Sequence, residues 1–113
     1  MIKIEAIIRP NMLDTVKAAL DDLGVQGITV THVMGAGRQR GRTQHYRGAE
    51  YVINLLDKIK VETVVMDDRA DEVMDAIAAA ASTGEIGDGK IFAYKVYNVM
   101  RIRTHEMGDA ALS

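Results

Sequence analysis

The sequence predicts a single α+β domain whose elements follow the order β-α-β-β-α-β. Runs that alternate between apolar and other residues, typical of strands, and runs with helical spacing follow one another in that order along the 113 residues. A chain of this length matches one domain of ordinary size. Its hydrophobic content of 48% is sufficient for a core, and its aromatic content of 4% means that aliphatic and methionine side chains must fill that core.

The first half of the chain predicts a strand, a helix and a second strand. Residues 2–9 alternate and give a strand with one buried face. Apolar residues recur at helical spacing over 12–23, with Asn11 as the expected cap and Gly24 as the expected end. Residues 28–34, "ITVTHVM", indicate the second strand. The residues of the first strand expected to face the core are Ile2, Ile4, Ala6 and Ile8.

The second half repeats the pattern. Residues 58–66 predict the third strand, Asp67 or Asp68 is the expected cap of a helix over 70–81, and residues 90–103 predict the fourth strand. The expected core faces are Ile59, Val61, Thr63 and Val65 on the strand, and Ala70, Val73, Met74, Ile77, Ala78 and Ala81 on the helix. This order is that of the ferredoxin-like split βαβ fold.

Between the second and third strands lies a long segment, "GAGRQRGRTQHYRGAEYVINL", in which neither period is visible. It carries four arginines between positions 38 and 47 and no acid there. Loops of this length in a small domain are usually functional or disordered. In a chain of net charge −2, a local basic cluster favours a discrete anion site over a nucleic-acid-binding face.

The sequence lacks the residues that several classes of function require. There is no cysteine, hence no disulfide and no thiolate metal site. No apolar run is long enough for membrane insertion, and the charged N-terminus does not resemble a signal peptide, so we expect a cytoplasmic protein. The first and third strands lack the aromatic residues on which RNA-recognition domains stack bases. His32, His45 and His105 show no metal-ligand spacing.

Two helices can cover only one face of a four-stranded sheet. The other face would expose a mixture of charged and aliphatic side chains, namely Lys3, Glu5 and Ile7 from the first strand and Lys60, Glu62 and Val64 from the third. A partly apolar sheet face favours assembly with other subunits.

Two glycine-rich stretches predict a phosphate ligand. Residues 35–41, "GAGRQRG", and 83–90, "TGEIGDGK", are turns whose backbone N–H groups can approach an anion. Neither is a dinucleotide fingerprint or a Walker loop. Arg101 and Arg103 alternate to one side of the predicted fourth strand and add positive charge suited to a triphosphate.

These stretches carry a resemblance. "GAGRQRG…YRGAEYV", "TGEIGDGKIF" and "RIRT" resemble the signature segments of the PII nitrogen-regulatory signal proteins, at the expected separations and over essentially the whole chain. The resemblance implies a homotrimer of ferredoxin-like subunits with one domain over 1–113. Within it, a T-loop would span about 37–55, a B-loop about 82–90 and a C-terminal loop about 101–113.

The resemblance also implies a function and no catalysis. ATP or ADP would bind between subunits, and Mg²⁺-ATP would create the site for 2-oxoglutarate. The T-loop would control ammonium channels, nitrogen-assimilation enzymes or the regulators of glutamine synthetase, with recruitment to the membrane through an ammonium channel. Tyr51 matches the position that a nucleotidyltransferase modifies in many bacterial members. No direct binding of nucleic acid is implied.

Carried over residue by residue, the resemblance implies two overlapping sets of ligands. The nucleotide-binding residues would be Ile7, Thr29, Gly35, Gly37, Arg38, Gln39, Glu62, Val64, Gly87, Asp88, Gly89, Lys90, Arg101 and Arg103. The 2-oxoglutarate-binding residues would be Gly37, Gln39, Arg40, Gly41, Lys58 and Gly87, with Gln39 also binding Mg²⁺.

Some positions depart from the family pattern, among them Asn11, Ala36, Asp57 and His105, the last of which replaces a usual glycine. The alternatives are a PII-like variant or a CutA-type trimer that responds to another small ligand, and a slow ATPase. Gln39 and Lys58 favour the sensor of ATP, ADP and 2-oxoglutarate over these alternatives, and no group suited to orienting an attacking water for an ATPase is evident.

Overall fold

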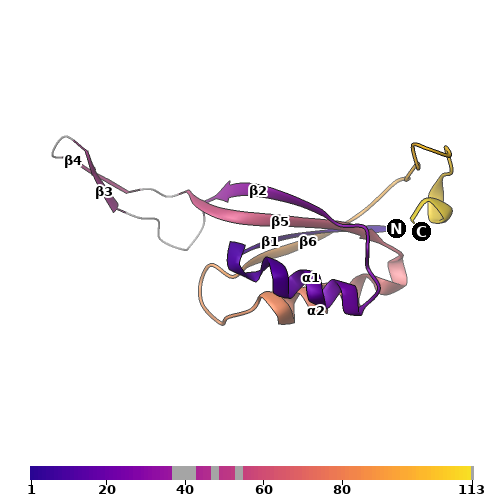
Figure 1. Cartoon of the computed structure of the whole chain (residues 1–113), viewed down its shortest axis with the longest axis horizontal. Helices are drawn as coiled ribbons and strands as arrows, with labels where there is room; N and C mark the ends of the chain where they lie inside the picture. Colours follow the sequence, from indigo (N-terminus) through magenta and orange to yellow (C-terminus); the bar gives the residue numbers. More distant parts are fainter. Residues whose placement is uncertain (37–42, 47–48, 53–54, 113) are drawn as a thin grey trace.

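The computed structural model describes residues 1–36, 43–46, 49–52 and 55–112. The predicted α+β order is confirmed (Figure 1). Its elements are β1 (Ile2–Ile8), α1 (Leu13–Asp22), β2 (Thr29–Gly35), β5 (Leu56–Val65), α2 (Ala70–Ala81) and β6 (Gly89–Lys95), with a short pair β3 (Thr43–Tyr46) and β4 (Ala49–Val52) between β2 and β5.

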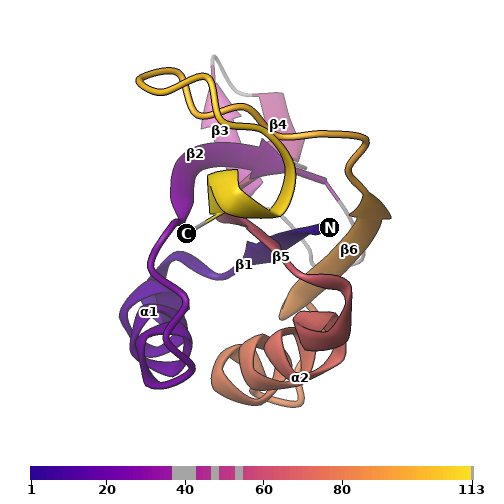
Figure 2. The same cartoon turned by 90° about the vertical axis from the view of Figure 1, so that its right-hand side faces the viewer.

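The main sheet has the strand order β2-β5-β1-β6, and every neighbouring pair is antiparallel. Both helices lie on the same side of it, as the end-on view shows (Figure 2). Neither of these two α-helices covers the opposite face. This is the ferredoxin-like arrangement that the sequence predicts.

The core forms where the alternating strand faces meet the helices. Ile4, Ala6 and Ile8 of β1 are at most 2% exposed. On β5 the predicted face is likewise buried, and the hydroxyl of its one polar member, Thr63, donates to the carbonyl of Gly27 at 2.7 Å. The helices contribute Val16, Leu20, Ala70, Val73, Ile77 and Ala81. Of the predicted helix stripe only Ala78 is wrong, because it is exposed.

The predicted helix caps are wrong. Each helix is preceded by a 3₁₀ turn, Pro10–Met12 or Asp67–Arg69, and no side chain caps either helix. These turns shift the helix starts to Leu13 and Ala70, beyond the reach of the predicted caps. Asp67 instead accepts a hydrogen bond from the N-terminal ammonium at 2.5 Å.

The predicted fourth strand is too long. It ends at Lys95, which pairs with Ile2, the first residue of its partner β1. The last bond runs from the Val96 amide to the Met1 carbonyl at 3.1 Å. Beyond it the Asn98 side chain accepts from the Val99 amide and bends the chain. Arg101 and Arg103 therefore do not lie on a strand, as the sequence suggested, but in a separate C-terminal segment.

The region between β2 and β5 also departs from the prediction. A loop without strands was expected, yet β3 and β4 pair antiparallel from Thr43 opposite Val52 to Tyr46 opposite Ala49. Each strand has only four residues. A run so short contains too few alternations for its period to be recognised in the sequence.

Candidate functional site

The predicted ligand residues fall into two groups at opposite ends of the sheet. Gly35 and Thr29 terminate the same strand, β2, and lie about 20 Å apart at ~3.3 Å per residue. Each end has its own cavity, of about 580 Å³ beside Gly35 and about 670 Å³ beside Thr29. We call them the loop-end cavity and the terminal cavity.

The loop-end cavity gathers seven predicted residues. Its lining includes Ile7, Gly35, Lys58, Gly87, Asp88, Gly89 and Lys90. They come from four strands and from the turn that leads from α2 into β6. Residues separated by more than 80 positions therefore meet here, because β1 pairs with both β5 and β6.

Asp88 organises the turn over 83–88. One of its carboxylate oxygens accepts from the Thr83 and Gly84 amides at 2.7 and 2.9 Å. The other accepts from the Thr83 hydroxyl at 2.5 Å and from Arg9 Nε at 3.1 Å. The hydroxyl and the amide of Thr83 together hold the pKa of Asp88 well below its ordinary value, so the carboxylate stays charged.

The glycines beside Asp88 let the backbone come close to its surroundings. Gly87 and Gly89 have φ of +105° and +106°, a region that side chains rarely adopt. A Cβ atom on Gly89 would lie 1.7 Å from the carbonyl oxygen of Ile7. The turn thus depends on glycine at position 89 for its contact with β1.

Arg9 was not among the predicted site residues. Besides Asp88, it contacts the turn through Nη2, which donates to the Ile86 carbonyl at 2.9 Å. Arg9 directly follows β1, whose pairing with β6 brings it to this end of the sheet. The sequence offered no signal for this contact, because 79 positions separate Arg9 from Asp88.

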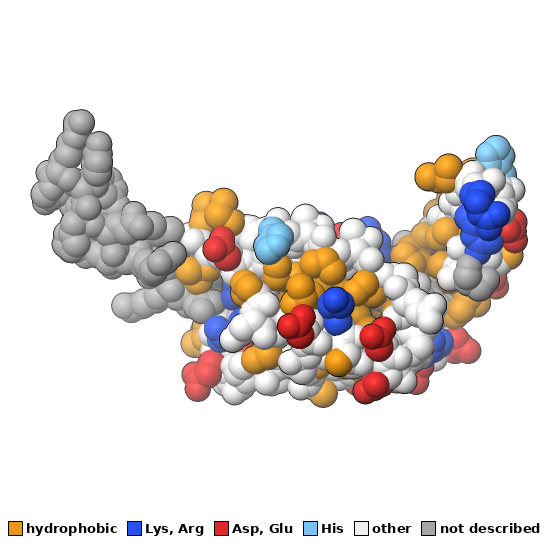
Figure 3. Space-filling model, viewed as in Figure 1, with side chains coloured by type: hydrophobic (Ala, Val, Ile, Leu, Met, Phe, Trp, Pro, Cys, Tyr) orange, Lys and Arg blue, Asp and Glu red, His pale blue; other side chains and the backbone are white. Residues whose placement is uncertain are grey.

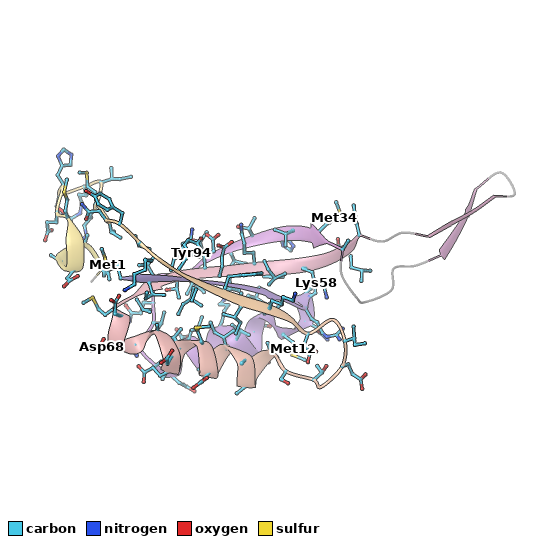
Figure 4. The ribbon with its side chains drawn as sticks, turned by 180° about the vertical axis from the view of Figure 1, so that it is seen from behind. Met1, Met12, Met34, Lys58, Asp68 and Tyr94 are labelled. Carbon is cyan, nitrogen blue, oxygen red and sulfur yellow. The ribbon has the colours of Figure 1, made fainter. Side chains whose placement is uncertain are left out.

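Lys58 links the third strand of the main fold, β5, to the turn. Its ammonium group donates to the Gly87 carbonyl at 2.8 Å. Burial, and then the positive charge of Arg9, lower the pKa of Lys58. Figure 4 shows Lys58 at the end of the sheet where Met34 lies, with Met1 at the opposite end.

The terminal cavity contains the other predicted residues of the strands. Thr29, Glu62 and Val64 line it, together with Lys3 and residues of the C-terminal 3₁₀ turn Gly108–Leu112, which we call the C-terminal turn. Thr29 pairs with Glu62 across β2 and β5.

Glu62 belongs to a charge network on the open sheet face. It lies 3.6 Å from Lys3 Nζ and 3.3 Å from Lys60 Nζ, and Lys60 also approaches Glu5 at 3.6 Å. The Tyr94 hydroxyl donates to Glu5 at 2.5 Å, which lowers the pKa of Glu5 and raises that of Tyr94. Opposite charges on this face are therefore balanced within the chain.

Arg101 and Arg103 belong to the C-terminal segment that follows β6, which projects from the body of the molecule and carries basic side chains (Figure 3). Arg101 donates to Glu106 Oε1 at 2.8 Å and to the Ala110 carbonyl at 3.1 Å. Arg103 is exposed. Gly37, Arg38, Gln39, Arg40 and Gly41 lie outside the described residues, as does the side chain of Tyr51, whose backbone belongs to β4.

Comparison with known proteins decides the family. The family model described as "Nitrogen regulatory protein P-II" matches residues 1–106. A protein of that name from Rhizobium meliloti (strain 1021) is 59% identical over 112 residues, which are 99% of this chain and 100% of the relative. The chain belongs to the PII family. "Nitrogen regulatory protein P-II 1" from Escherichia coli (strain K12) is 54% identical over the same shares of both chains.

PII proteins are signalling regulators and not enzymes, in agreement with the expectation from the sequence. Within the described ranges, no group of three or more His, Asp or Glu side chains could hold a metal ion. Likewise, no helix in the described part of the chain has the length and hydropathy to cross a bilayer.

Proposed function

We propose that this PII chain is a sensor of ATP, ADP and 2-oxoglutarate that acts on partner proteins through its T-loop. The observation that carries the proposal is the preformed turn over 83–88, which Asp88 and Arg9 hold at the edge of the loop-end cavity. Its positive-φ glycines and the adjoining Lys90 supply backbone donors and a cation of the kind that phosphates require.

A complete nucleotide site on this proposal needs two copies of the chain. Thr29, Glu62 and Val64 lie at one end of the sheet, and the turn with Gly87 and Gly89 lies at the other. A single copy does not bring them to one ligand. In a homotrimer, the terminal cavity of one subunit would meet the loop-end cavity of the next, and Arg101 and Arg103 would reach the phosphates of a nucleotide bound between them.

The open sheet face supports such an assembly. Its charges are already paired within the chain, so that covering it leaves fewer ions without partners. Phe92 and Tyr94 on β6 are 51% and 45% exposed and add apolar area to it. Light scattering should give three times the chain mass of 12.4 kDa. A monomer at micromolar concentration would contradict the two-copy site.

Lys58 is the proposed partner of 2-oxoglutarate. Its ammonium group already lies at the loop-end cavity, held by the Gly87 carbonyl at 2.8 Å, and would donate to a carboxylate there. Mg²⁺ would bring a further positive charge through the ATP phosphates and Gln39, which lies outside the described residues. This dependence on the bound metal would make 2-oxoglutarate binding conditional on ATP.

The proposed output is the segment between β2 and β5. Ammonium channels, nitrogen-assimilation enzymes and regulators of glutamine synthetase are its proposed partners, and a nucleotidyltransferase would modify Tyr51. Contact with an ammonium channel would bring the protein to the membrane surface.

Calorimetric titration of 2-oxoglutarate tests the proposal. Binding is expected with Mg²⁺-ATP, and neither with ADP nor without nucleotide. Lys58→Met should abolish it and retain ATP binding, whereas Lys17→Met, which removes an exposed lysine of α1, should change nothing. Failure of ATP to bind would refute the nucleotide site, and ATP binding without any 2-oxoglutarate response would refute the second ligand.

A further inference from the structure

We propose that residues Arg101–Leu112 form a clasp that commits Arg101 to internal partners, and that a nucleoside polyphosphate opens this clasp by taking Arg101 from Glu106. The inference rests on the proposed function, since it names the contact that regulates the same nucleotide site. It assigns roles to Glu106 and to the C-terminal turn, neither of which is among the expected ligands.

The clasp is closed by both terminal nitrogens of the Arg101 guanidinium. Arg101 Nη1 donates to Glu106 Oε1 at 2.8 Å, and Nη2 donates to the Ala110 carbonyl at 3.1 Å. Two backbone bonds of 2.8 Å, from the Arg101 amide to the Glu106 carbonyl and from the His105 amide to the Arg101 carbonyl, close the loop beneath them. The guanidinium is therefore engaged, and the carboxylate of Glu106 offsets its charge.

Arg101 and Arg103 differ in this respect, although the sequence presents them as a pair. The side chain of Arg103 is exposed, and it makes no hydrogen bond or ion pair with another residue that the structure describes. The side chain of Arg101 is only 26% exposed. A phosphate can meet Arg103 directly, whereas it must displace Glu106 to gain the full charge of Arg101.

Opening the clasp would also change the terminal cavity. Ala110, which accepts the bond from Arg101, belongs to the C-terminal turn, and its neighbours Asp109, Ala111 and Leu112 line the cavity. The same cavity holds Thr29 and Glu62. Loss of the Arg101 contacts would therefore free one wall of the cavity at the moment when phosphate is recognised.

Backbone strain favours the opening. His105 has φ of +61°, where residues other than glycine are strained because Cβ crowds the following carbonyl oxygen. The bonds on either side of His105 hold it there, since its amide donates to Arg101 and Glu106 closes the loop. On this proposal the two backbone bonds open together with the contacts of the Arg101 side chain, so His105 can relax and the released strain lowers the cost of exchange.

The test compares Glu106→Gln with Asp75→Asn. Each variant removes one negative charge; Glu106 contacts Arg101, whereas Asp75 is an exposed residue of α2 that lines neither cavity. Glu106→Gln is expected to raise the affinity for ATP about two- to fivefold, the range for a partly exposed ion pair. Asp75→Asn should change it less than about 1.5-fold, because it leaves the clasp intact. Calorimetry gives both affinities.

Hydrogen exchange of the wild type provides a measurement that needs no variant. ATP should speed the exchange of the Arg101 and His105 amides, which the clasp protects. Slower exchange with ATP, or weaker binding by Glu106→Gln, would mean that Glu106 orients Arg101 for the ligand and would overturn the proposal. Unchanged exchange, or equal effects of the two variants, would also overturn it while the nucleotide site stands. No ATP binding by the wild type would overturn both.

Discussion

Replacing Gly89 by alanine should break the contact between the turn over 83–88 and β1. Gly89 has φ of +106°, which costs an L-residue about 1–3 kcal/mol. In addition, the new Cβ would lie 1.7 Å from the Ile7 carbonyl oxygen, well inside van der Waals contact. The neighbour is backbone, so β1 and β6 must separate where Ile8 pairs with Gly89. Loss of one or two ladder bonds adds about 1–2 kcal/mol.

Gly84→Ala separates the cost of the backbone conformation from the cost of the close approach to Ile7. Gly84 also has positive φ, +85°, but a Cβ there meets no atom within 4 Å. Gly84→Ala should therefore cost only the backbone term, and Gly89→Ala about 1–2 kcal/mol more. Urea unfolding at one fixed protein concentration measures both, since assembly makes apparent stability depend on concentration. Equal losses within about 0.5 kcal/mol would refute the argument from close approach.

Three further changes have expected outcomes. Ile77→Ala, at a fully buried position of α2, should lower the free energy of unfolding by about 2–5 kcal/mol in urea titrations; a loss below 1 kcal/mol would contradict its place in the core. Because the pKa of Asp88 is lowered in the fold, its contribution is present above the ordinary carboxyl pKa and is lost as pH falls through the folded value, so the stability of Asp88→Asn should depend less on pH in acid than that of the wild type. Tyr94→Phe removes the hydroxyl that lowers the pKa of Glu5, and NMR titration should show that pKa rising.

The periodicity of the sequence predicted which faces of the strands and helices are buried. The inward faces of β1 and β5 could be read from the sequence because alternate strand positions point to opposite sides of a sheet, and a helix-covered face must be apolar. The apolar stripe of α2 followed in the same way, apart from Ala78, which is small enough to tolerate either environment. These features depend only on the residues of each segment and on the one layer that packs against it.

The ends of elements could not be predicted, because they depend on distant partners. β6 ends opposite Ile2, the first residue of β1, so its end is set by its partner strand and not by its own residues. Asp67 is of a residue type that often caps helices, yet its carboxylate accepts a hydrogen bond from the N-terminal ammonium, 66 positions away. A local pattern contains no information about either event.

The glycine-rich stretches identified the turn of the candidate site, but not how the chain holds it. Arg9 follows a strand that the sequence had assigned to the core, and only the pairing of β1 with β6 brings it to Asp88. Similarly, "RIRT" indicated two equivalent arginines, whereas Glu106 and Ala110 engage one of them. The sequence thus predicted the residue types of the site, but not which of these side chains are already bonded to another residue of the chain.

The separation of the two cavities has a consequence for regulation. Since Thr29 and Gly35 terminate opposite ends of one strand, a nucleotide that uses both ends can bind only to assembled copies. Binding and assembly would then be linked, so ATP should shift the assembly equilibrium by mass action, and dilution should weaken ATP binding. An ATP affinity that stays constant on dilution into the range where the assembly dissociates would place the whole site within one chain. That would require the terminal cavity to take no part in binding.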